Sequence, residues 1–104
     1  MSIASAGFVR ERDIARIAAV CRQQHVRRLA LFGSVLRPDF GPDSDIDVLV
    51  EFLPGQTPGL GFFTLQAELS EILGRCVDLN TPLDLPATFR DHVVRTATPL
   101  YELA

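Results

Sequence analysis

The sequence lacks long apolar runs and a surplus of basic charge. No apolar run approaches the roughly 18 residues of a membrane-spanning helix, and pieces such as Leu29 to Phe32 are the longest. Ten Lys and Arg stand against 13 Asp and Glu, which gives a net charge of −3. Because a broad grip on a nucleic-acid backbone needs a clustered basic surplus, we expect neither a nucleic acid nor a membrane as a direct partner.

Cysteine is also scarce. Cys21 and Cys76 are the only two, each lies in an apolar context, and they do not form a C-x-x-C pair. The expectation is therefore two reduced, buried cysteines in a cytoplasmic protein. The first residues show neither a basic leading segment nor an extended apolar stretch, so no secretory signal is predicted.

The length leaves little room for a second domain. The 104 residues, of which 47% are hydrophobic and 22% charged, predict a single globular domain over residues 1–104. A chain of this size has space for a catalytic centre but not for a separate acceptor pocket. We therefore expect part of the substrate site to come from a partner.

Hydrophobic periodicity predicts an α/β (α+β) domain with a small mixed sheet flanked by helices. Ile14, Ile17 and Cys21 repeat at helical spacing, which predicts a helix over about 9–24 with His25 in its last turn. Consecutive or alternating apolar residues predict the strands, and Gly74 is expected to end the second helix. The remaining expected elements are strands at 27–33, 45–52 and 75–80, helices at 62–73 and 87–97, and an edge strand or docking tail at 99–104.

Two aspartates begin the most regular predicted strand. Asp45 and Asp47 are separated by one residue, so their side chains leave the same face of the strand. Two such carboxylates repel each other unless a cation bridges them, and hard oxygen ligands suit Mg²⁺ or Mn²⁺. The alternative is that the pair only borders a loop, where aspartates are common.

Asp78 is a third candidate. It interrupts the apolar strand Cys76-Val77-Asp78-Leu79, where burying an unpartnered charge is expensive. If this strand lies beside the one that carries Asp45 and Asp47, the three carboxylates match the arrangement of a two-metal phosphoryl-transfer site. Otherwise Asp78 is a solvent-facing residue of an edge strand.

Gly33 ends the first predicted strand, and Ser34 follows it at the start of a short helical turn. Glycine permits close approach to a ligand, and amide groups that open a helical turn can hold phosphate. A Gly-Ser pair alone is only a common turn. His25 and His92 lack the spacing of zinc ligands, so no zinc site is predicted.

Taken together, these motifs resemble one family. Gly33-Ser34, ten further residues and then Asp45-Ile46-Asp47 resemble the G-S-x10-D-x-D motif of the polymerase-β-type nucleotidyltransferase superfamily. The string GSVLRPDFGPDSDIDVLVEF, the VDL around Asp78 and the closing segment RDHVVRTATPLYE are similar to minimal nucleotidyltransferase (MNT) antitoxins of HEPN/MNT toxin–antitoxin pairs. The resemblance covers the chain from Arg27 onward.

The resemblance implies a transferase that moves AMP from ATP to a tyrosine hydroxyl of a HEPN ribonuclease toxin, with which it forms a hetero-oligomer. It implies two Mg²⁺ ions held by Asp45, Asp47 and Asp78, with Asp78 on the acceptor side. Gly33 and Ser34 would hold the triphosphate.

Arg37 matches an arginine that is common after the Gly-Ser pair of the family. It would contact phosphate or brace the aspartates, or else pair with Asp39 or Asp43 at the surface. Pro38 stands where these sequences often have glycine, and it removes an amide donor from the loop.

Two other functions remain open at this stage. The chain could be a non-catalytic antitoxin that binds and occludes the ribonuclease, since an acidic surface suits an RNA-binding partner. It could also be a nucleotidyltransferase with a small-molecule or RNA acceptor, although the absence of basic runs counts against RNA. If a variant without the three aspartates still neutralised the toxin, the non-catalytic antitoxin would be favoured over the enzyme.

Overall fold

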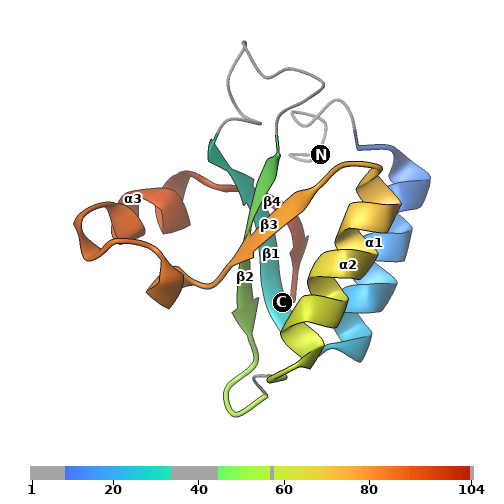
Figure 1. The fold of residues 1–104 in the computed structure, drawn as a ribbon, viewed down its shortest axis with the longest axis horizontal. Helices are drawn as coiled ribbons and strands as arrows, with labels where there is room; N and C mark the ends of the chain where they lie inside the picture. Colours follow the sequence, from blue (N-terminus) through green and yellow to red (C-terminus); the bar gives the residue numbers. More distant parts are fainter. Residues whose placement is uncertain (1–8, 34–44, 57, 104) are drawn as a thin grey trace.

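In the residues that the structure describes, three α-helices pack against a four-stranded sheet (Figure 1). The computed structural model describes residues 9–33, 45–56 and 58–103. In this part of the chain, no helix has the length and apolar character needed to cross a membrane. The elements are α1 (Glu11–Gln23), β1 (Val26–Phe32), β2 (Ile46–Phe52), α2 (Gly61–Leu73), β3 (Val77–Asn80), the short 3-10 helix η3 (Pro82–Asp84), α3 (Ala87–Thr96) and β4 (Thr98–Glu102).

The sheet is mixed, as predicted, with the strand order β3-β2-β1-β4. β1 runs antiparallel to both β2 and β4, whereas β2 and β3 are parallel. Parallel strands need a crossover connection, and α2 provides it between β2 and β3. The two edges of the sheet are therefore β3 and β4.

The two faces of the sheet are covered differently. α1 and α2 lie side by side over one face, while α3 lies on the opposite side (Figure 1). The larger core cluster lies under α1 and α2 and includes Ile17, Leu65 and Leu69. The second face carries a smaller cluster of Leu49, Leu85 and Val93. Among the described residues, fewer buried apolar side chains therefore lie on the second face than on the first.

Alternation along β2 assigns its side chains to these two faces. Ile46, Val48 and Val50 belong to the larger cluster, and Leu49 belongs to the smaller one. Asp47 therefore projects from the second face, with Leu49, because side chains two positions apart share a face. The alternation predicted for this strand is confirmed.

Helix ends follow simple backbone rules. α2 ends at Gly74, as predicted, which adopts a left-handed conformation with φ 68°. α1 ends at Gln23, so the expectation that His25 lies in its last turn is wrong. His25 has φ 60° and forms the tight turn into β1 instead. The C-terminal residues form the edge strand β4, one of the two predicted alternatives.

The two cysteines differ in exposure. Cys21 is buried in the larger core cluster, as predicted. Cys76 is exposed, so the expectation that it is buried is wrong. It lies between the Gly74 turn and Val77, the first residue of β3. Both thiols are free.

Candidate active site

A row of three residues crosses the sheet at one end. Phe32, the last residue of β1, is the register partner of Asp47. Asp47 is in turn the register partner of Asp78 on β3. The condition that the sequence argument left open, that the strand of Asp78 lies beside the strand of Asp47, is therefore met. The parallel pairing places the two aspartates directly opposite each other.

Both aspartates project from the second face of the sheet. Val77 and Leu79 flank Asp78 in β3, and both belong to the core under α1 and α2. Because side chains alternate along a strand, Asp78 projects from the opposite face. Asp47 lies on that same face, between the buried Ile46 and Val48. The two carboxylates thus share one side of two adjacent strands.

Solvent reaches this row. Asp78 is exposed, Asp47 is half-buried, and Asp45 is exposed immediately before β2 begins. Asp45 stands two positions before Asp47, at the same end of the sheet. A charged substrate could therefore approach these carboxylates without displacing the core.

Gly33 lies closely against Asp47. It follows β1 directly and has φ 75°, a conformation that L side chains rarely adopt. A methyl group at Gly33 would overlap Oδ2 of Asp47 and would stand only 3.2 Å from its Cγ. The first member of the Gly-Ser motif is thus fixed by backbone conformation and by contact with a candidate catalytic residue.

Two predicted site residues lie outside the described residues. These are Ser34 and Arg37, together with Pro38 in the same segment. Their proposed contacts with phosphate stay predictions. Gly33, Asp45, Asp47 and Asp78 are the predicted site residues that the structure describes.

The row fits a magnesium ion by chemistry, although the ligands are not gathered into a closed cluster. Within residues 9–33, 45–56 and 58–103, no three His, Cys, Asp or Glu side chains are grouped closely enough to hold a metal ion. Asp47 and Asp78 offer two hard oxygen donors from facing strand positions, and Asp45 offers a third nearby. Mg²⁺ is usually held by one or two carboxylates together with water and substrate phosphates, so such a partial donor set suits it.

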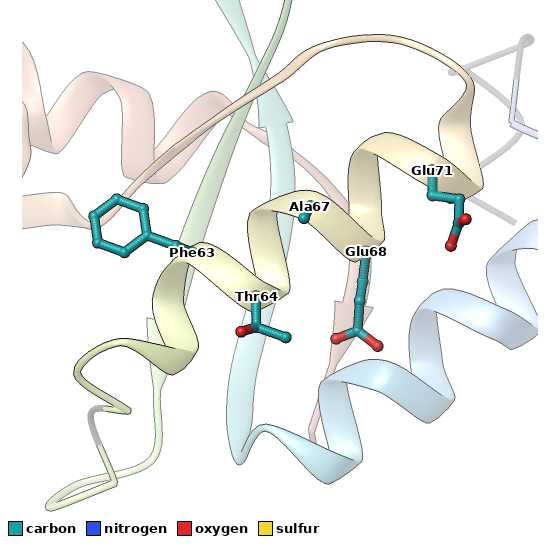
Figure 2. A pocket seen from close by; sticks show the side chains of 5 residues that line it. All are labelled: Phe63, Thr64, Ala67, Glu68 and Glu71. Carbon is teal, nitrogen blue, oxygen red and sulfur yellow. The ribbon is translucent and has the colours of Figure 1, made fainter.

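Two surface hollows lie away from this row. One, of about 490 Å³, follows the outer side of α2 and is lined by Phe63, Thr64, Ala67, Glu68 and Glu71 (Figure 2). The other, of about 370 Å³, lies between the end of β2 and η3. Neither is lined by Gly33 or by the three aspartates.

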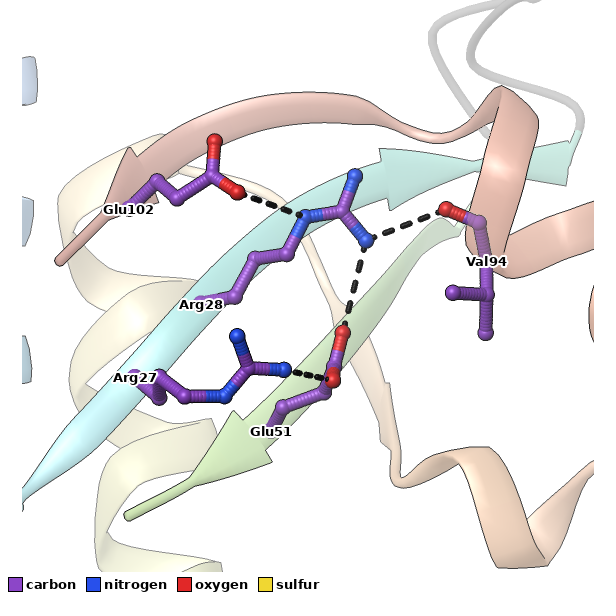
Figure 3. A network of polar contacts seen from close by, with 5 residues as sticks. All are labelled: Arg27, Arg28, Glu51, Val94 and Glu102. Atoms are coloured by element: carbon purple, nitrogen blue, oxygen red, sulfur yellow. Dashed lines mark hydrogen bonds and ion pairs between the residues drawn. The ribbon is translucent and has the colours of Figure 1, made fainter. Parts of the chain in front are cut away.

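A polar network at the other end of β2 holds α3 over the second face (Figure 3). Nη1 of Arg28 donates to the carbonyl of Val94 at 3.1 Å and lies 3.4 Å from Glu51. Its Nε lies 3.7 Å from Glu102, and Arg27 also pairs with Glu51. Sequence reasoning missed this network, although two arginines inside an apolar strand were a usable signal.

A family model and a curated relative each match most of the chain. The family model "Polymerase beta, Nucleotidyltransferase" matches residues 15–104. The curated "Putative protein adenylyltransferase MJ0435" of Methanocaldococcus jannaschii is 34% identical over 82 residues, which covers 79% of this chain and 87% of that protein.

Two solved structures share the fold. The "Structure of putative minimal nucleotidyltransferase" superposes with a TM-score of 0.70 at 34% identity and covers 83% of this chain and 87% of its own. The "Crystal structure of the toxin-antitoxin with AMP-PNP" superposes with a TM-score of 0.62 at 22% identity and covers 86% of this chain and 73% of its own.

Proposed function

The chain belongs to the polymerase-β-type nucleotidyltransferase family, and from that premise we propose that it is an antitoxin that transfers AMP from ATP to a tyrosine hydroxyl of a HEPN ribonuclease toxin. Its enzyme class, nucleotidyltransferase, follows from the family. The acceptor, the toxin partner, ATP as donor and the need for Mg²⁺ are parts of the proposal. A cytoplasmic location, where thiols stay reduced, agrees with the free Cys21 and Cys76.

The observation that carries the proposal is the facing pair of aspartates beside a close-packed glycine. Asp47 and Asp78 are register partners on one face of the sheet, and Gly33 leaves no room for a side chain against Asp47. Carboxylates that project from one face of adjacent strands offer the hard oxygen ligands that Mg²⁺ prefers. This arrangement supports transfer of a nucleotidyl group more specifically than the fold alone does.

The proposed reaction assigns a role to each site residue. Bound Mg²⁺, with two ions expected, would neutralise the triphosphate and the charge that develops during displacement. Asp45 and Asp47 would hold the ions, and Asp78 would either complete this set or accept the proton of the tyrosine hydroxyl. Gly33 allows the backbone to approach the triphosphate, and Ser34 and Arg37 are proposed to contact it.

The step itself is an in-line displacement. The tyrosine oxygen forms a bond to the α-phosphorus of ATP, and the bond from that phosphorus to the bridging oxygen of the β-phosphate breaks. Pyrophosphate leaves with the electron pair, and the hydroxyl proton passes to Asp78 or to water. Since positioning and charge neutralisation dominate such transfers, the chain needs no covalent nucleophile of its own.

A protein acceptor agrees with the open character of the site. Asp45 and Asp78 are both exposed, so the second face could admit a side chain carried by a partner. The toxin–antitoxin structure with AMP-PNP has the same fold, and the curated relative is named as a protein adenylyltransferase. Both support a partner protein as acceptor.

The test is mass spectrometry of the cognate toxin after incubation with the chain, ATP and Mg²⁺. We expect the mass of one or more AMP units on a toxin tyrosine, and none when Mg²⁺ is chelated. A toxin that gains no mass from the wild-type chain would contradict the proposal. If a variant with all three aspartates changed to asparagine still neutralised the toxin fully, occlusion without catalysis would replace it.

A further inference from the structure

β3 carries Asp78 but is supported by a strand on only one side. It has four residues, Val77–Asn80, and lies at the edge of the sheet, where β2 is its only strand partner among the described residues. The amide of Ile46 donates to the carbonyl of Cys76 at 2.9 Å, so alternate residues of this segment face β2. The backbone groups of Val77 and Leu79 therefore face away from the sheet.

Two side chains of α2 replace the missing strand. Oγ of Ser70 accepts a hydrogen bond from the amide of Val77 at 3.0 Å. Oε1 of Gln66 accepts one from the amide of Leu79 at 2.9 Å. Ser70 also donates its hydroxyl to the carbonyl of Gln66 at 2.9 Å. One turn of α2 thus holds the strand immediately before and immediately after Asp78.

We propose that Gln66 and Ser70 are positioning residues for Asp78, an inference that rests on the proposed function. A four-residue edge strand with one neighbour can shift or fray. The hydrogen bonds from the amides of Val77 and Leu79 to α2 hold β3 in place beside β2. They thereby fix the separation between the Asp78 and Asp47 carboxylates. Neither side chain needs to touch substrate, because both act through the backbone on either side of Asp78.

The geometry also explains why polar residues occupy this side of α2. Gln66 and Ser70 are both partly buried, between the core positions Leu65 and Leu69 and the strand. A purely apolar side chain there would leave an amide of β3 without a partner, which is costly in a buried place. The helix therefore carries two acceptors at a spacing of four residues, the spacing at which helical side chains share a face.

The decisive variants separate the hydrogen bond from the packing. Gln66→Met keeps the length of the side chain but removes the acceptor, and Gln66→Glu restores an acceptor oxygen. Ser70→Ala removes the second acceptor. Thr64→Ala is the matched control, because Thr64 is an exposed residue of the same helix.

Two readouts are measured on the whole chain with its toxin partner: steady-state AMP transfer, and the dissociation constant for Mn²⁺ from electron paramagnetic resonance titration. We expect Gln66→Met and Ser70→Ala to lower kcat by about 10-fold or more, as loss of a supporting hydrogen bond does at metal sites. KM for ATP should stay within about twofold, since Gly33 and the triphosphate contacts are untouched. Gln66→Glu and Thr64→Ala should behave as the wild type.

The Mn²⁺ titration tests that the effect passes through Asp78. Gln66→Met should weaken Mn²⁺ binding in the wild-type background but add nothing in an Asp78→Asn background. The inference would be overturned if Gln66→Met kept the kcat and the Mn²⁺ affinity of the wild type. It would also be overturned if Gln66→Met weakened Mn²⁺ binding equally in the wild-type and Asp78→Asn backgrounds. Either result would leave the proposed function standing. A wild-type chain that neither transfers AMP nor binds Mn²⁺ would overturn both.

Discussion

Gly33 links the backbone of one strand to the carboxylate of the next. Its φ of 75° and its close approach to Asp47 are separate constraints: a side chain at this position would strain the backbone, and it would also force Asp47 to shift. The first is conformational and applies wherever the chain turns in this way. The second is steric and applies only at the candidate site. Gly55 has φ 74° with nothing within 4 Å of the position of a Cβ atom.

Gly33→Ala and Gly55→Ala therefore form a matched pair. Both should lose about 1–2 kcal/mol of stability from the left-handed backbone conformation. Only Gly33→Ala should also displace Asp47, and we expect AMP transfer to fall by about 100-fold in that variant. Thermal unfolding and transfer rates check the two effects. Equal rates of AMP transfer in both variants would show that the close approach of Gly33 to Asp47 does not contribute to catalysis.

The two thiols should differ sharply in reactivity. Burial raises the pKa of the Cys21 thiol from 9.0 to about 12, against a smaller opposing effect of Arg22. The raised pKa keeps Cys21 protonated as the pH rises through the ordinary range of a thiol, so its thiolate forms only near the upper value.

We expect one thiol per native chain to react rapidly with Ellman's reagent at about pH 8, and the second only on unfolding. Cys76→Ser should abolish the rapid phase. Raising the pH to about 10 should not make Cys21 reactive, because its pKa lies higher in the folded state and the thiol stays protonated. A rapid native reaction in Cys76→Ser would show that Cys21 is accessible.

At the scale of elements, the alternation of buried and polar side chains along β2 was predictable from the sequence. Which strand lies beside β2 was not. Apolar residues at 46, 48 and 50 specify one buried face because side chains alternate along a strand. The same rule places Asp47 on the opposite face. That β3 pairs with β2 was only a condition in the sequence argument, because short strands do not specify their neighbours. The parallel register through α2 supplies that information.

The contacts that hold α3 could not be read from the sequence. Arg28 and Val94 are 66 positions apart, and no local pattern indicates that they meet. The same holds for Gln66 and Leu79, whose bond depends on how α2 crosses β3. Exposure of Cys76 was missed because its apolar neighbours suggested burial, whereas the strand begins only at Val77.

Arg28 should stabilise the packing of α3 on the sheet. Its side chain is 13% exposed and its partner Glu51 is 17% exposed, so solvent screens the pair weakly. We expect Arg28→Met to cost about 1–3 kcal/mol in free energy of unfolding, because the carbonyl of Val94 and the Glu51 carboxylate lose a donor. Chemical denaturation measures this.

Arg16→Met is the control for that experiment. Arg16 is 56% exposed and lies 3.8 Å from Asp13 within one helix. Because the arginine of this pair is largely exposed, whereas Arg28 is not, we expect the pair to contribute only about 0–1 kcal/mol. If both variants lost the same stability, the network in Figure 3 would have no special role in holding α3.

At the scale of the whole molecule, the acidity and the small size of the chain both fit a site that metal ions and a partner protein complete. Three of the 13 acids lie at one end of the sheet, on or directly before neighbouring strands, and the proposed ions would neutralise them. A site that is negative alone would then attract a triphosphate. With α1 and α2 over one face of the sheet and α3 on the other, the molecule can present the end of the sheet that carries the exposed Asp45 and Asp78 to a larger partner.

The central claim is that the aspartate row performs the transfer, and kcat for AMP transfer to the purified toxin tests it most directly. Asp47→Asn and Asp78→Asn should each lower kcat by about 100-fold or more. Asp91→Asn, a change at an exposed aspartate of α3, should leave kcat as in the wild type. Wild-type rates in either Asp47→Asn or Asp78→Asn, with the fold intact by circular dichroism, would contradict the account.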